Sequence, residues 1–123
     1  LWKIGGNLVN GVIVGTYFHH QQPGQKVDTF VHDFEAKYGR KPDAWAAQAY
    51  DTLHLLAQAM REAKTTHPEE VAKALQKIHY QGVTGKTAFD KQGDLVGRTI
   101  TTKVVQDQHF EYLGLNAAYD SRQ

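Results

Sequence analysis

The chain has 123 residues, of which 14 are basic and 13 acidic, so its formal net charge is +1. This length suits one ordinary domain, and a hydrophobic share of 41% is that of a globular protein rather than a disordered or collagen-like chain. The balanced charge gives no general attraction to nucleic acid or anionic membranes, and the absence of cysteine excludes disulfide and thiolate chemistry.

The first predicted element is a strand over residues 11–17. Its Val12-Ile13-Val14 run is apolar on both faces, which is typical of a strand in a parallel sheet covered by helices on each side. The glycine and asparagine residues before it indicate the end of an upstream element and a turn. Because only one strand precedes the helices, we interpret the chain as a fragment of a larger fold whose sheet is completed from outside it.

Two amphipathic helices are predicted after a polar turn at Pro23-Gly24. In the first, apolar residues recur at helical spacing from Val27 to Tyr38, and Gly39 provides the stop. The second begins at the N-cap Asp43 and continues to about Lys64. We expect its core-facing stripe to comprise Ala46, Ala49, Tyr50, Leu53, Leu56, Ala57 and Met60.

The remainder is predicted to form a short helix and extended segments. The helix starts at Thr66 or His67, and its buried face comprises Val71, Ala74, Leu75 and Ile78. Residues 82–89 are predicted as extended and residues 90–93 as a turn. Residues 99–105 and 110–113 are predicted as a hairpin about Asp107. One strand, three helices and a strand pair in this order indicate an α/β protein.

The residue types that usually carry chemistry form no catalytic or metal-binding pattern. The 7 histidines are scattered, and adjacent His19 and His20 in a strand would point to opposite faces, so we interpret them as structural or solvent-exposed. The single serine, Ser121, lies in the tail. Since no base, nucleophile and oxyanion set can be assembled, the sequence predicts a protein that is not an enzyme and uses no cofactor.

Two local motifs imitate ligand sites without meeting their requirements. Residues 82–87 end in Gly-Lys-Thr like a phosphate-binding loop, but two residues separate the glycines where the motif needs four. Asp90 and Asp94 flank a turn, and this loop lacks the oxygen donors and closing glutamate of an EF-hand. We therefore expect neither nucleotide nor calcium binding there.

Trp45 is the aromatic residue that most favours a binding role. It lies in the first turn of the second helix, where a ring can form the wall of a pocket whose free backbone N–H groups favour anions. The alternative is that the ring only covers the end of the core. The sequence leaves both interpretations open.

The order of several segments resembles the branched-chain amino-acid-binding protein family, the type I periplasmic receptors of ABC importers. The resemblance runs from about Gly6 to Phe110 and matches roughly the last third of a full-length member. It rests on Tyr38-Gly39 with Pro42-Asp43, on Ala49-Tyr50-Asp51, and on Gly82-Val83-Thr84-Gly85 leading to Phe89-Asp90 and Gly93-Asp94.

This resemblance implies a type I periplasmic binding protein fold, with two α/β lobes, three crossing segments and a solute-binding cleft that closes by hinge motion. Residues 1–17 would belong to the second lobe, residues 18–88 to the first, and residues 89–123 would return to the second. Trp45 would line the cleft. Tyr17 and Phe18, at a crossing, are further candidates for the cleft or hinge.

The same resemblance implies a periplasmic or extracellular receptor that passes a small molecule to the membrane permease subunits of an ABC importer. The small molecule would be an amino acid or a small aromatic acid, with no nucleic acid partner. The full-length protein would be a monomer, whereas the isolated segment would exchange segments between chains to complete its sheet. The alternative is a ligand-sensing domain of the same fold in a receptor or regulator.

Overall fold

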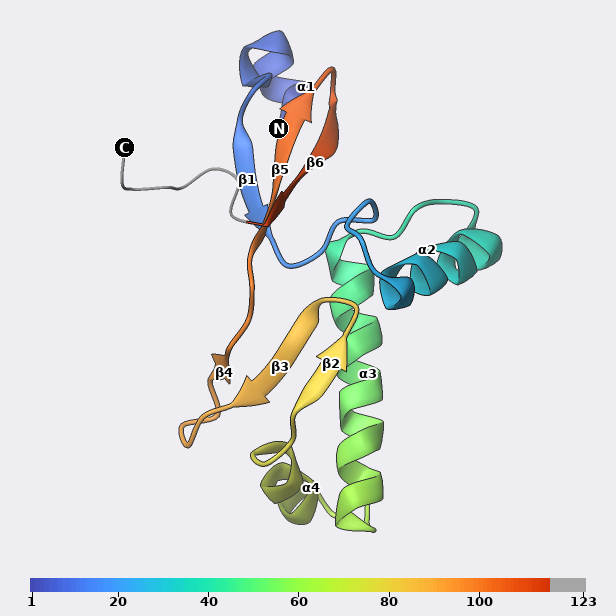
Figure 1. Ribbon diagram of the computed structural model, residues 1–123, viewed down its shortest axis with the longest axis vertical. Helices are drawn as coiled ribbons and strands as arrows, with labels where there is room; N and C mark the ends of the chain where they lie inside the picture. The colour runs from blue at the N-terminus through green and yellow to red at the C-terminus, as the bar shows by residue number, and fades with distance from the viewer. Residues whose placement is uncertain (116–123) are drawn as a thin grey trace.

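A computed structural model describes residues 1–115 and shows a molecule with two parts (Figure 1). The sheet part contains β1 (Ile13–Thr16), β5 (Thr101–Gln106) and β6 (His109–Leu115), with the short helices α1 (Trp2–Gly5) and η1 (Gly6–Val9). The helical part contains α2 (Gln25–Tyr38), α3 (Ala44–Ala63), α4 (Pro68–Leu75), β2 (Tyr80–Gly82), β3 (Gly85–Phe89) and β4 (Leu95–Val96).

Two connections join these parts (Figure 1). We call residues 17–22, which follow β1, the first crossing, and residues 97–100, which precede β5, the second crossing. Because β1 and β5 are hydrogen-bonded neighbours, the two crossings start from adjacent strands of one sheet. The chain therefore leaves the sheet part once and returns to it once within the described residues.

The sheet has the order β1-β5-β6, and both pairings are antiparallel. The predicted hairpin about Asp107 is confirmed, since Asp107 and Gln108 turn the chain with φ of 47° and 66°. Among the described residues β1 pairs only with β5, and this pairing is antiparallel, so the predicted parallel neighbours from outside the chain stay a prediction. β5 enters the sheet from the second crossing and so runs opposite to β1, and Ile13 is 50% exposed rather than covered by helices.

The first two helices begin and end close to their predicted limits. Gly39 ends α2 in the left-handed conformation, with φ 65°, which glycine adopts without steric cost. Asp43 caps α3 by accepting a 2.9 Å hydrogen bond from the Ala46 amide. The core beside these helices consists of Phe18, Val27, Phe30, Val31, Ala47 and Val83.

The predicted core stripe of α3 is wrong in part, since Ala46, Leu56 and Met60 pack partly against the core but are not its fully buried residues. Tyr50 is 41% exposed and Leu53 68% exposed, whereas the buried residues recur at four-residue spacing: Ala47, Asp51, Leu55 and Ala59. The physical reason is that the β2–β3 hairpin packs on the face that carries Asp51. A hydrophobicity count assigns a carboxylate to solvent and therefore selects the opposite face.

The predicted buried face of α4 is confirmed in position. Val71 and Ile78 are buried with Leu55 and Ala59 of α3, and Ala74 and Leu75 pack partly against this cluster. Pro68 occupies the first turn, as expected. The helix itself ends at Leu75, so Ile78 contributes from the segment that leads to β2.

Residues 82–89 do not form one extended segment, as predicted, but a tight hairpin. Gly82 pairs with Gly85, and Val83 and Thr84 form the turn between β2 and β3. The predicted turn at residues 90–93 is confirmed, since the amides of Gln92 and Asp94 each donate to the Asp90 carboxylate at 2.9 Å.

A buried carboxylate holds the hairpin turn against α3. The amides of Val83 and Thr84 donate to Asp51 at 2.9 Å and 2.7 Å, and the Thr84 hydroxyl donates to it at 2.6 Å. We call Asp51, Val83 and Thr84 the Asp51 anchor. Gly82 completes it, because a Cβ built at Gly82 would lie 2.3 Å from the Asp51 carboxylate. Small size, rather than backbone freedom, is what this glycine provides.

Asp51→Asn is expected to lower the free energy of unfolding by about 2 kcal/mol, since an amide NH2 would face a backbone donor that then stays buried without a partner. Urea unfolding of the full-length protein measures this. Asp43→Asn is the matched control on the same helix, because asparagine caps a helix as well as aspartate does. Equal stability of the two variants would contradict the role given to Asp51.

Candidate functional site at the crossings

Trp45 lies where the sequence predicts it, in the first turn of α3, and its side chain is 80% exposed. Within residues 1–115 this exposure shows only that the ring is not part of this chain's own packed core. A tryptophan that covers the end of this chain's own core would be buried, whereas a large exposed ring beside a helix start offers apolar area to something else.

Tyr17 is the first residue of the first crossing and is 36% exposed. The guanidinium carbon of Arg98, on the second crossing, lies 4.5 Å from the centre of the Tyr17 ring. This distance is within the range of a cation–π interaction. The tyrosine ring therefore has one face held by the neighbouring crossing.

Phe18 follows Tyr17 but points into the core, where it is 1% exposed. Its ring packs edge-on against Phe30 of α2, with 5.7 Å between the ring centres. This contact fastens the first crossing to the helical part. The two neighbouring aromatic residues thus face different surroundings, one at the surface and one in the core.

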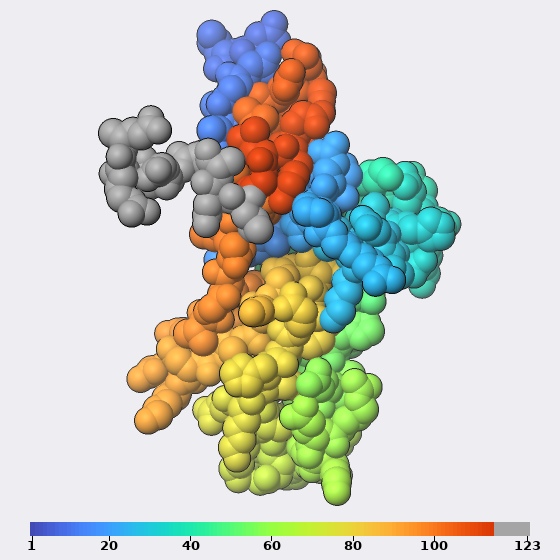
Figure 2. All heavy atoms as spheres, in the orientation of Figure 1, coloured from blue at the N-terminus to red at the C-terminus, as the bar shows by residue number. Residues whose placement is uncertain are grey.

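The first crossing is also hydrogen-bonded to both parts of the molecule. The Tyr112 amide of β6 donates to the Gln21 side chain at 3.2 Å. The Gln22 side-chain amide donates to the Val83 carbonyl at 3.0 Å and accepts from the His19 amide at 3.1 Å. Space-filling spheres show the blue residues of this crossing and of the start of α2 between the red sheet and the yellow hairpin (Figure 2).

A hollow of about 440 Å³ lies between β5–β6 and the start of α3. Its wall includes His19, His20, Lys41, Lys103 and Phe110. The rings of His19 and His20 stack at 4.5 Å, and the Lys103 ammonium lies 3.8 Å from the centre of the Phe110 ring. Both parts of the molecule contribute to this hollow, so a rotation of one part against the other would change its shape.

Burial disfavours positive charge on the groups that surround this hollow. It lowers the pKa of His19, and the neighbouring charge of His20 acts in the same direction. Burial also lowers the pKa of His20, with a further contribution from Lys41. The pKa of Lys103 is lowered by burial as well, although the carboxylate of Asp43 partly opposes this. The imidazoles therefore act as neutral polar groups near pH 7.

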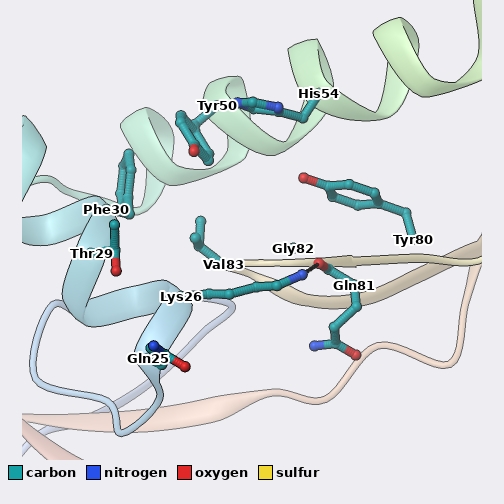
Figure 3. A pocket seen from close by; sticks show the side chains of 10 residues that line it. All are labelled: Gln25, Lys26, Thr29, Phe30, Tyr50, His54, Tyr80, Gln81, Gly82 and Val83. Atoms are coloured by element: carbon teal, nitrogen blue, oxygen red, sulfur yellow. Dashed lines mark hydrogen bonds between the residues drawn. The ribbon is translucent and has the colours of Figure 1, made fainter.

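A second hollow, of about 370 Å³, lies between α2, α3 and β2. Figure 3 shows Tyr50 and His54 of α3 facing Tyr80 of β2 across it. The Lys26 ammonium reaches the Gln81 carbonyl at 2.5 Å and so ties the start of α2 to β2. None of the three candidate ligand contacts, Trp45, Tyr17 and Phe18, lines this hollow.

Within residues 1–115, no group of three or more histidine and acidic side chains is arranged to hold a metal ion. In the same described range, no helix combines the length and hydrophobicity that a bilayer crossing needs. The polar groups at the crossings instead bind each other or the backbone. The arrangement is suited to holding two parts of a molecule together around exposed aromatic rings.

Sequence reasoning missed three residues at this site: Asp51, Thr84 and Arg98. In the sequence, Asp51 and Thr84 stand out only as members of the motifs that carry the family resemblance. Arg98 belongs to none of these motifs. One signal for Asp51 was available, since it lies four residues after Ala47 and four before Leu55. A single acid in such a stripe needs buried donors, and the glycine-flanked turn at residues 83–84 is the place that supplies them.

A sheet part and a helical part joined by paired crossings are the arrangement expected in the class of two-lobed binding proteins. A comparison with protein families agrees: the chain belongs to the periplasmic binding protein family, whose model matches residues 1–108. Its fold is that of type I periplasmic binding proteins.

Among curated proteins, the Leu/Ile/Val-binding protein homolog 1 of Brucella abortus is 32% identical over 95 residues, which are 76% of this chain and 25% of that protein. An ABC transporter substrate-binding protein of Desulfitobacterium hafniense, solved in complex with Leu, superposes with a TM-score of 0.79 at 37% identity. That match covers 85% of this chain and 32% of the solved one.

The branched-chain amino acid transporter substrate-binding protein LivJ of Streptococcus pneumoniae, solved with isoleucine, has a TM-score of 0.71 at 28% identity. The match covers 84% of this chain and 29% of LivJ. The chain thus spans about a third or less of the length of the relatives it matches.

The phenol of Tyr80 provides a test of the surroundings of the Asp51 anchor. Burial, together with the nearby charge of Asp51, raises the pKa of Tyr80 to about 12. Because the folded-state pKa lies above the usual value near 10, this contribution to stability is complete below about pH 10 and is lost as the pH rises toward 12.

We expect ultraviolet titration of the full-length protein to show one late tyrosinate that Tyr80→Phe removes. Asp51→Asn should move this titration to lower pH, because it removes the negative charge that opposes ionisation. A Tyr80 titration unchanged in the Asp51→Asn variant would show that the carboxylate does not act on the phenol.

Proposed function

We propose that this chain is part of a solute-binding receptor that captures a small molecule between two lobes and delivers it to an ABC importer. The exposed ring of Trp45, in the first turn of α3 where the neighbouring Ala44 packs against the cluster that contains Phe18, is the observation that carries the proposal. The names of the relatives support it, since the curated and solved proteins above are described as amino-acid-binding or as transporter substrate-binding proteins. We infer from this that the protein is not an enzyme.

In this proposal residues 1–17 belong to the second lobe, residues 18–88 to the first lobe, and residues 89–123 return to the second. Residues 116–123 lie outside the described part of the chain. The two sheets support this division in outline, because β1, β5 and β6 form one sheet and β2, β3 and β4 another, with the crossings between them. Residues 89–96 lie with the helical part, since β4 pairs with β3, so the second crossing falls later than residue 89. Most polar contacts to a solute would then come from outside this chain.

We propose Trp45 as the apolar wall of the binding cleft and Tyr17 as a neighbouring contact at the crossing. Both present ring area at the surface. Phe18 supports the same region as a hinge residue, because its buried ring holds the first crossing on α2. A tryptophan wall accommodates an aliphatic side chain by apolar contact and a planar acid by stacking, so the ligand class is an amino acid or a small aromatic acid.

The proposed receptor acts as a monomer in the periplasm or at the cell surface, and its protein partners are the permease subunits of the importer. The rival function is a ligand-sensing domain of the same fold. The importer receptor and the sensing domain would both bind a solute in the cleft, but they act on different partner proteins. A binding measurement therefore tests the cleft and does not distinguish the two functions. Uptake of the bound solute by cells that lack the gene tests the importer role.

Trp45→Ala in the full-length protein is expected to raise the dissociation constant for the best ligand about tenfold, the loss that follows removal of a central aromatic contact. A thermal-shift screen of the twenty amino acids and small aromatic acids finds that ligand. At one hundred times its dissociation constant a ligand adds about 2.7 kcal/mol to stability. Isothermal titration calorimetry then measures the affinity of each variant.

Tyr38→Ala is the matched control, since Tyr38 is also an exposed aromatic residue and packs on Phe34 of α2, 4.5 Å between ring centres. Its affinity should equal that of the unaltered protein. If Trp45→Ala binds as tightly as the control, Trp45 is not a wall of the cleft. If no compound in the screen binds a well-folded protein, the proposed solute class is wrong.

A further inference from the structure

We propose that Arg98 is a positioning residue that fastens the two crossings to each other and to α3, and thereby sets how tightly the receptor holds its ligand. This inference rests on the proposed function, because it concerns the affinity of the same cleft. It assigns a role to a residue that the sequence analysis does not single out. The argument starts from the two contacts of the Arg98 guanidinium.

The first contact is the face of Tyr17. The Arg98 guanidinium carbon lies 4.5 Å from the ring centre, so the second crossing stacks on the first residue of the first crossing. A planar guanidinium suits this arrangement, since it can stack through its face while its N–H groups point sideways to other acceptors. Lysine has a similar charge and lacks this geometry.

The second contact is the hydroxyl of Thr84. Arg98 Nη2 donates a hydrogen bond to Thr84 Oγ1, and the same hydroxyl donates its own hydrogen to Asp51 Oδ2 at 2.6 Å. A hydroxyl carries one hydrogen and two lone pairs, so both bonds can exist together. Because Asp51 fixes the direction of the hydroxyl hydrogen, the lone pairs are turned toward Arg98.

These contacts form one continuous series from Tyr17 through Arg98 and Thr84 to Asp51. Asp51 is 5% exposed and Thr84 2% exposed, so the Asp51 end of this series of contacts is rigid. Arg98 Nε is buried, and it has no hydrogen-bond partner among residues 1–115. The position of the side chain is therefore explained by the stack on Tyr17 and the bond to Thr84, and not by complete pairing of its own donors.

Arg98 also borders the helix face that carries Trp45. With Gln48 and Thr52 of α3 it lines a hollow of about 250 Å³. Trp45, Gln48 and Thr52 are spaced three and four residues apart, which places them along one face of α3. Arg98 thus stacks on the ring of Tyr17 and borders the face of α3 that carries Trp45.

A hinge closes by changing backbone angles in its crossings, and the observed affinity of a two-lobed receptor depends on the population of its closed form. Two crossings tied through Arg98 move as one unit. Without the tie the two crossings have more conformational freedom before binding, so ordering them in the closed form costs more conformational entropy. Loss of Arg98 therefore weakens binding even though the arginine need not touch the ligand.

The test is Arg98→Met in the full-length protein, which keeps the length of the side chain and removes its charge and donors. We expect the dissociation constant of the ligand found in the screen to rise about tenfold. Arg98→Lys should recover part of this loss. Arg40→Met is the matched control, because Arg40 also stacks on an aromatic ring, that of Phe34 at 5.2 Å, away from both crossings.

Hydrogen exchange of the ligand-free protein gives a readout that needs no ligand. In Arg98→Met, amides of both residues 17–22 and residues 97–100 should exchange faster, while those of α4 stay unchanged. A change confined to the second crossing would refute the tie. So would an unchanged dissociation constant, or an affinity loss that Arg40→Met shows equally.

A double substitution tests the path through Tyr17. If Arg98 acts by holding the ring, Arg98→Met should weaken binding less in a Tyr17→Leu background than in the unaltered protein. Additive effects would overturn this step. If the unaltered protein binds nothing in the screen, the proposed function fails, and the exchange of the two crossings still decides whether Arg98 ties them together.

Discussion

The buried carboxylate of Asp51 is the interaction on which the rest of this structure depends. A carboxylate that is 5% exposed is stable only when its oxygens accept hydrogen bonds, and the turn at Val83 and Thr84 provides them. This requirement places the β2–β3 hairpin on α3 and selects the buried face of that helix. It also explains Gly82, since a side chain there would collide with the carboxylate.

The same constraint reaches the crossings. Thr84 contacts Asp51 on one side and Arg98 on the other, and Arg98 continues to Tyr17. The first crossing is held separately, by Phe18 in the core and by Gln22 on the hairpin. A receptor of this class must keep its lobes in register while they move. Fixing the crossings on one buried polar anchor serves both needs, because the anchor is buried while most of the second crossing is exposed.

The relation between Asp51 and the turn also explains why the resembling motifs occur together. Ala49-Tyr50-Asp51 and Gly82-Val83-Thr84-Gly85 lie more than thirty residues apart in the sequence, and in the structure they form one hydrogen-bonded unit. A family resemblance found these two segments without giving the reason for their pairing. The buried carboxylate supplies it, because a donor-rich turn and its acceptor must be present together.

The sequence by itself determined the local elements of this protein. The stop at Gly39, the cap at Asp43, the turn at Asp90 and the hairpin about Asp107 follow from the backbone preferences and short-range hydrogen bonds of a few neighbouring residues, so each was predicted correctly. The position of Trp45 in the first turn of α3 followed from the same signals. Tertiary structure alone decided the antiparallel pairing of β1 with β5, the burial of Asp51 instead of Leu53, and the meeting of Arg98 with Tyr17 and Thr84. These depend on contacts between residues far apart in the chain, where a polar side chain can be buried once distant donors reach it, and periodicity contains no information about such donors.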